Sequence, residues 1–368
     1  MSETLSYVFK DKRGRVLYSA SPHRAMIPAS NMKIVTGFVS SVILGDDFEI
    51  KTYFRVSESD LIITGGPTPL LRIEEIERII ERLKDYKIKR VMFNRSLDED
   101  YYAPGWPSED QRECYQSRIT SFSLNENCIP RSETENGKNG VEPHSGRKIT
   151  DIRPYDTLSR TLVSEGERDI FPSFDFTDSN DGKLVYTHKE KVGDILEHLE
   201  PISCNFSADV LFKFVHHYKA GLLGSWRGGS SVTRKSLERM NLLEPNLTIV
   251  DGSGLSSLNR LTPSFISDLL RKALSVENGK FIEHMASPGD GTLRKRLDEF
   301  GDYGIKAKTG SLTGVATISG FIRKLNVTFS LMLNNTEKKG KDARDVLDDT
   351  LTEMIHKIEK NRKIGRGN

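Results

Sequence analysis

The chain has 368 residues, of which 36% are hydrophobic and 29% are charged, with 54 basic and 52 acidic side chains. This length allows two domains and a substantial core, and the near balance of charge argues against nucleic acid as a partner. No stretch reaches the ~20 consecutive apolar residues that a membrane-spanning helix needs.

The first 50 residues predict a hairpin followed by a buried helix. Residues 5–10 and 15–20 are strand-like and are separated by a turn at 11–14. Residues 30–44 form an apolar run that ends at Gly45, which predicts a helix with Ser30 near its N-terminus. The free N–H groups and the positive end of the helix dipole would then point toward Ser30.

Beyond this helix the character of the sequence changes. Short strand-like runs lie at 53–56, 61–64 and 88–93. They surround one amphipathic helix at 73–86, and the polar, glycine-containing residues 132–147 predict a loop. We therefore predict an inserted, smaller α+β domain at residues 51–182.

The rest of the chain predicts helices packed on a sheet. Helical spacing lies at 189–199, 206–218, 263–274 and 344–360. Strand-like runs lie at 304–308, 316–323 and 327–334. No internal repeat and no long low-complexity tract interrupts this pattern.

Three short motifs stand out. Ser30-Asn31-Met32-Lys33 places a hydroxyl and an amine one turn apart on a helix face. If that face is buried, the pKa of the amine falls and the neutral amine can take the serine proton. The other two motifs are Ser203-Cys204-Asn205 and Lys308-Thr309-Gly310.

Each motif alone is a weak signal, but their order is specific. Ser-x-x-Lys, Ser-Asp-Asn and Lys-Thr-Gly in this order are typical of penicillin-binding proteins and class A β-lactamases. Because the motifs lie at both ends of the chain, we expect residues 1–50 and 183–368 to form one discontinuous catalytic domain.

Longer blocks extend this likeness over roughly residues 5 to 335. The chain resembles the low-molecular-mass class C penicillin-binding proteins, the D-alanyl-D-alanine carboxypeptidase/endopeptidases. The blocks lie at 27–36, 61–68, 104–110, 123–127, 251–263, 291–297 and 306–312. The resemblance implies an α/β (α+β) fold like that of penicillin-binding proteins and serine β-lactamases, with an antiparallel sheet flanked by helices.

The resemblance also implies a role for each motif residue. Ser30 is expected as the nucleophile, Lys33 as the base, and Ser203 as a proton relay. Asn205 would orient the substrate amide. Lys308 and Thr309 would bind the terminal carboxylate of the substrate, and Gly310 would leave the strand edge open to it. The backbone N–H groups of Ser30 and Ser311 would form the oxyanion hole. Asp110 would lie near the substrate side chain. No metal or cofactor is implied.

Two of the departures from the family concern the site. Cys204 stands where the family usually has Asp or Asn, and Ser257 stands where it often has an arginine that binds the diaminopimelate end of the peptide stem. Recognition of that side chain is therefore in question, although the matching acidic position, Asp110, is kept.

Simpler interpretations stay open for several residues. Ser203 can instead cap the following helix, Asp110 can cap a local turn, and the Asp251-Gly-Ser-Gly segment is expected to be structural support. The three cysteines fit no zinc pattern. A bridge between Cys114 and Cys128 would need an oxidising compartment, and we expect three free thiols.

These observations predict a serine-type D-Ala-D-Ala carboxypeptidase/DD-endopeptidase that is acylated on Ser30 by penicillin and other β-lactams. Its partners would be D-Ala-D-Ala-type peptides or wall fragments. The alternatives are a related serine esterase, β-lactamase or D-peptidase on non-murein substrates, and a non-catalytic peptide-binding homologue. The N-terminal residues carry no secretory signal pattern, which predicts a cytoplasmic location for the chain as given and an extracytoplasmic one if a leader was removed.

Overall fold

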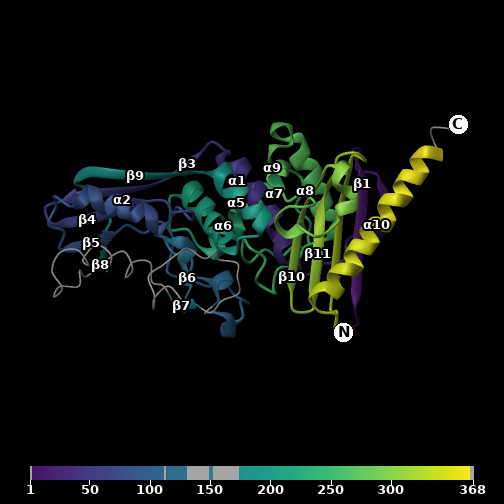
Figure 1. Ribbon diagram of the computed structural model, residues 1–368, viewed down its shortest axis with the longest axis horizontal. Helices are drawn as coiled ribbons and strands as arrows, with labels where there is room; N and C mark the ends of the chain where they lie inside the picture. Colours follow the sequence, from purple (N-terminus) through teal and green to yellow (C-terminus); the bar gives the residue numbers. More distant parts are fainter. Residues whose placement is uncertain (1, 112, 131–148, 152–173, 365–368) are drawn as a thin grey trace.

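Two five-stranded sheets lie at opposite ends of the molecule, with a group of helices between them (Figure 1). The structure is a computed structural model that describes residues 2–111, 113–130, 149–151 and 174–364. The loop predicted at 132–147 lies outside these residues. Within the described part of the chain, no helix is both long enough and apolar enough to span a bilayer.

The first sheet joins the two ends of the chain. Its order is β10 (Ile305–Leu312), β11 (Val315–Ile322), β12 (Val327–Asn334), β1 (Thr4–Asp11) and β2 (Val16–Ala20). All neighbours are antiparallel, and Tyr7 of β1 pairs with Leu331 of β12. The predicted hairpin and the three predicted C-terminal strands are confirmed.

Helices cover both faces of this sheet. Phe329 and Leu331 of β12 pack in one cluster with residues of α10 (Gly340–Ile364). On the other face, the hydroxyls of Thr328 and Ser267 lie 2.8 Å apart, and Ser267 belongs to α8 (Pro263–Ser275). Burial on both faces explains why β11 and β12 are buried along their whole length. The expected antiparallel sheet flanked by helices is confirmed.

Four further helices fill the middle of the molecule (Figure 1). They are α1 (Met32–Leu44), α5 (Val192–Ile202), α6 (Asn205–Ala220) and α7 (Trp226–Arg239). The start predicted for α5 is wrong, because residues 189–191 continue a strand that pairs with β3. We missed α7, whose paired glycines, 228 and 229, weaken the helical signal but let the helix pack tightly on α6.

The second sheet is mixed. Its order is β8 (Phe174–Phe176), β5 (Arg90–Phe93), β4 (Asp60–Gly65), β3 (Glu49–Ser57) and β9 (Lys183–Lys191). β4 and β8 run parallel to β5, and β3 is antiparallel to both of its neighbours. The helix α2 (Ile73–Leu83) shares its core. β9 begins at residue 183 and belongs to this sheet, and the domain boundary at residue 182 stays a prediction.

The expectation of three free thiols is wrong. The structure joins Cys114 and Cys128 in a disulfide and leaves Cys204 as a buried free thiol. The Cα atoms of the bridged pair are 5.4 Å apart, within the usual range for a disulfide. The bridge ties η3 (Cys114–Gln116) to the first residue of β6 (Cys128–Pro130), which pairs with β7 (Ile149–Asp151).

Candidate active site

Ser30 lies in a strained turn at the start of α1. It is the middle residue of the 3₁₀ turn η1 (Ala29–Asn31), and Ala29 before it has a φ of 45°, in the left-handed region that non-glycine residues seldom adopt. Gly254, itself at φ +83°, holds this turn closely, because a Cβ at that position would lie 1.8 Å from the Ala29 oxygen. The tight contact between these two segments fixes where Ser30 points.

Lys33 lies one helical turn after Ser30 and is fully buried. Its Nζ donates to Ser30 Oγ at 2.9 Å, to Asn205 Oδ1 at 2.6 Å and to the Ser253 carbonyl at 2.8 Å. Burial lowers the pKa of Lys33 to about 8, although Asp209 and other acidic groups nearby oppose the shift. Three predicted site residues therefore meet through direct hydrogen bonds.

The second motif lies between two helices. Ser203 ends α5 in the left-handed conformation, and Cys204 caps α6 by accepting from Ser207 N at 3.4 Å. The alternative that Ser203 caps this helix is therefore wrong. Among the described residues no hydrogen bond joins the Ser203 hydroxyl to Lys33 or Lys308. Asn205, the first residue of α6, also donates to the Tyr115 carbonyl at 2.8 Å.

The third motif lies on β10, at one edge of the first sheet. Lys308 is fully buried, and its Nζ donates to the Thr309 carbonyl at 3.0 Å. Burial, and then the charge of Lys33, lower the pKa of Lys308 to about 7. A Cβ on Gly310 would lie 2.7 Å from Ser30 N, and its expected role in leaving the strand edge open to substrate stays a prediction. This glycine lets the strand approach the nucleophile.

The backbone direction of β10 can be read from one bond. The N–H of Ala307 points away from β11 and donates to Ala286 at 2.9 Å. Because N–H direction alternates along an antiparallel strand, the N–H groups of Thr309 and Ser311 also point away from β11. This is the orientation that the expected oxyanion donor at Ser311 requires.

One buried residue that supports the site, Asp209, escaped sequence reasoning. Asp209 of α6 is fully buried and accepts from Gly252 N at 2.8 Å and from Ser253 N at 2.9 Å. These bonds hold the Ser253 carbonyl in place for Lys33. The signal that could have found Asp209 was the Asp251-Gly-Ser-Gly segment, whose expected role as structural support fits this position.

Asp251 connects that segment to the middle part of the chain. Its carboxylate accepts from Gly254 N at 2.8 Å, from Ser256 N at 2.6 Å and from Trp106 Nε1 at 2.8 Å. Trp106 precedes the turn η2 (Ser108–Asp110), which carries Asp110.

Asp110 reaches the site indirectly. The pKa of Tyr115 is raised, mainly by burial and secondly by the hydrogen bond that the Tyr115 hydroxyl donates to Asp110. The Tyr115 side chain is 46% exposed, and its backbone carbonyl accepts from Asn205. Tyr115 and Asp110 therefore lie together beside the second motif, and the substrate role of Asp110 stays a prediction.

One group of described residues has the donor atoms of a metal site. Glu126, His198 and Cys204 place one donor atom each within 4.8 Å of one another. These donors already pair, because Glu126 accepts from Cys204 at 3.3 Å, lies 2.7 Å from His198 Nε2, and accepts from Arg72 at 3.2 Å. A cation here would have to displace the Arg72 guanidinium. The group is a satisfied polar network behind the second motif.

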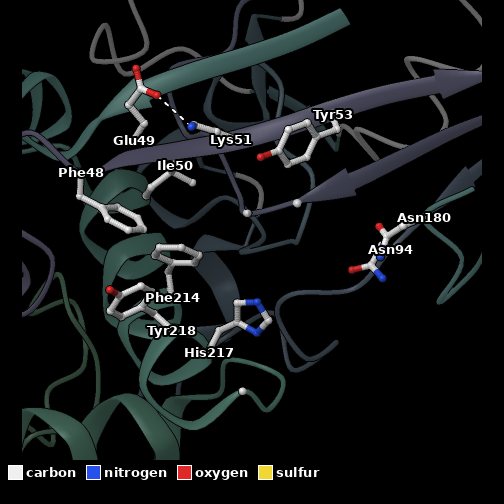
Figure 2. Close-up of a pocket in the computed structure, with 13 residues that line it drawn as sticks. Phe48, Glu49, Ile50, Lys51, Tyr53, Asn94, Asn180, Phe214, His217 and Tyr218 are labelled. Atoms are coloured by element: carbon white, nitrogen blue, oxygen red, sulfur yellow. Dashed lines mark ion pairs between the residues drawn. The ribbon is translucent and has the colours of Figure 1, made fainter. Parts of the chain in front are cut away.

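A separate hollow of about 500 Å³ lies at the other end of α6, roughly 13 Å along the helix from Asn205. Figure 2 shows aromatic side chains of α6 facing β3 across it. Its lining includes Phe48, Phe214 and Tyr218, and none of the predicted site residues.

Comparisons with known proteins agree with this arrangement. The family described as D-Ala-D-Ala carboxypeptidase 3 (S13) matches residues 3–158 and 176–354. The D-alanyl-D-alanine carboxypeptidase of Actinomadura sp. (strain R39) is 22% identical over 84% of this chain and 73% of that protein.

Solved structures share the fold. Penicillin-binding protein 4 of Haemophilus influenzae superposes with a TM-score of 0.74 at 19% identity, over 92% of each chain. A predatory peptidoglycan endopeptidase of Bdellovibrio bacteriovorus superposes with a TM-score of 0.59 at 16% identity, over 97% of this chain and 94% of that one. The former has also been solved in complex with a β-lactam, and the latter acylated by penicillin G.

Proposed function

We propose that this chain, which belongs to the D-Ala-D-Ala carboxypeptidase 3 (S13) family, is a serine peptidase that hydrolyses peptide bonds between D-amino acids through an acyl-enzyme on Ser30. The observation that carries the proposal is the 2.9 Å contact between Lys33 Nζ and Ser30 Oγ inside a site where burial lowers the pKa of Lys33 to about 8. An ordinary surface lysine could not serve as a base near neutral pH.

Acylation then follows from the positions of these groups. Lys33 in its neutral form takes the proton of Ser30, whose Oγ attacks the carbonyl carbon of the penultimate D-residue. The backbone N–H groups of Ser30 and Ser311 stabilise the negative oxygen that develops, and one such donor is typically worth ~3 kcal/mol of barrier. The peptide bond breaks when the leaving amine accepts a proton, a step for which Ser203 is the predicted relay.

Substrate binding explains the third motif. Lys308 in its ammonium form, together with Thr309, would bind the terminal carboxylate of the peptide, while the outward N–H and carbonyl groups of β10 pair with its backbone. Water then hydrolyses the ester on Ser30 and returns the proton to the site. A β-lactam would enter the same way and remain on Ser30, because its opened ring keeps the leaving amine attached.

The test uses a fluorescent penicillin and a peptide ending in D-Ala-D-Ala. Wild-type protein should retain the label on a denaturing gel and release D-Ala, detected by mass spectrometry. The Ser30→Ala variant should do neither, while its circular dichroism spectrum stays that of the wild type. A folded wild-type protein that neither acquires the label nor releases D-Ala would overturn the proposal and favour the peptide-binding alternative.

A further inference from the structure

A buried carboxylate beside the active site has no part in the mechanism above. Glu200 is fully buried on α5, three residues before Ser203. Neither of its carboxylate oxygens has a hydrogen-bond partner among the described residues. Buried charges without partners are costly, so packing alone would favour an apolar residue here, as at Leu196 and Leu199 on the same helix.

The neighbouring helix leaves room for this carboxylate. A Cβ on Gly37 of α1 would lie 2.6 Å from Glu200 Oε1 and 2.8 Å from the Phe281 ring. Gly37 lies one turn after Lys33 on the same helix. A carboxylate and a space that fits it therefore occur together next to the catalytic lysine.

The cations that act on the charge of Glu200 come from three other parts of the chain. They are Lys308 on β10, Lys33 on α1 and His284 after α9 (Lys280–Glu283). Burial raises the pKa of Glu200 to about 7, and these cations, Lys308 first, oppose the rise. His284 Nε2 lies 3.0 Å from Asp46, whereas neither Lys33 nor Lys308 has a carboxylate in direct contact among the described residues.

The two lysines depend on Glu200 to different extents. Asp209 and Asp251 both raise the pKa of Lys33 more than Glu200 does. Glu200 alone among the described carboxylates raises the pKa of Lys308, whereas burial and Lys33 lower it. Removing the Glu200 charge should therefore change Lys308 strongly and Lys33 little.

We propose that Glu200 is a positioning residue whose buried carboxylate is the counter-charge that favours the ammonium form of Lys308, the form that can hold the terminal carboxylate of a substrate. The part that concerns substrate rests on the proposed function. The part that concerns the charge of Lys308 does not depend on that function, since it starts from a fully buried, unpartnered carboxylate in the space beside Gly37, one turn after Lys33.

The first experiment needs no substrate. NMR titration of protein labelled with ¹³C at lysine should show that Glu200→Gln lowers the pKa of Lys308 by at least about one unit, the effect of losing an opposite charge nearby. Glu200→Asp, which keeps a carboxylate, should retain most of the wild-type value. Glu190→Gln is the matched control, since Glu190 is buried in the second sheet, where it contacts His188.

The second experiment compares a peptide ending in D-Ala-D-Ala with its C-terminal amide. At pH 8, Glu200→Gln should raise KM about tenfold for the peptide with a free carboxylate, because a Lys308 pKa lowered by about one unit leaves about a tenth of its ammonium form. KM for the amide should stay unchanged. An equal loss for both peptides, or an unchanged Lys308 titration, overturns the inference. If wild-type protein cleaves neither peptide, the proposed function fails while the titration still decides the role of Glu200. Glu200→Leu replaces Glu200→Gln if the latter does not fold.

Discussion

The pH dependence of the reaction tests the lysine pair most directly. Burial lowers the pKa of Lys33 to about 8 and that of Lys308 to about 7. Raising the pH removes the proton from Lys33 and so creates the base. Raising the pH also removes the ammonium of Lys308 and so weakens carboxylate binding. These opposite signs predict a bell-shaped profile of kcat/KM.

The size of the effect follows from these two pKa values. At pH 7 about one Lys33 in ten is neutral, against about one in 3000 for a lysine at the ordinary 10.5, a gain of about 300-fold in active base. The maximum should lie near pH 7.5, midway between about 8 and about 7. Because the lysines titrate together, the two limbs belong to the pair rather than to either residue.

The assay is kcat/KM for release of D-Ala between pH 5.5 and 9.5, at constant ionic strength. The rate should fall about tenfold per pH unit well away from the maximum on either side. With the amide-capped peptide the alkaline limb should disappear, because Lys308 then has no carboxylate to bind. An acid limb near pH 10, or a flat profile, would show that Lys33 is not the buried base described above.

Three substitutions test other parts of the site. Ser30→Ala should abolish the covalent penicillin label on gels and change the free energy of unfolding by less than about 1 kcal/mol, measured in urea. Gly254→Ala forces a Cβ toward the Ala29 carbonyl at a positive φ, so it should cost at least about 2 kcal/mol of stability and slow labelling; an unchanged urea midpoint would contradict the close contact. Replacing Cys114 and Cys128 together by serine should lose about 2–3 kcal/mol in the same assay, and reductant should mimic it in wild-type protein.

Local patterns in the chain were enough for much of the fold. Strand-like runs predict the strands of the first sheet, and the distance from Ser30 to Lys33 is set by one helical turn, whatever the rest of the protein does. The order of the three motifs added the family and hence the sheet with flanking helices. One exception was α7, whose two glycines weaken its helical signal. The other was the end of β9, where pairing of residues 189–191 with β3 outweighs their local helical pattern.

Everything that decides the charge of the site comes from long-range packing. Asn205 reaches Lys33, and β10 reaches Ser30, only because β1 pairs with β12 and α6 packs on α1. In the sequence, Asp209 and Glu200 look like ordinary polar residues of surface helices. Only the tertiary structure buries them beside two lysines, and burial is what brings the pKa values of those lysines toward neutrality. Chain order therefore determined which groups could react, and desolvation in the folded protein determined that they can do so near pH 7.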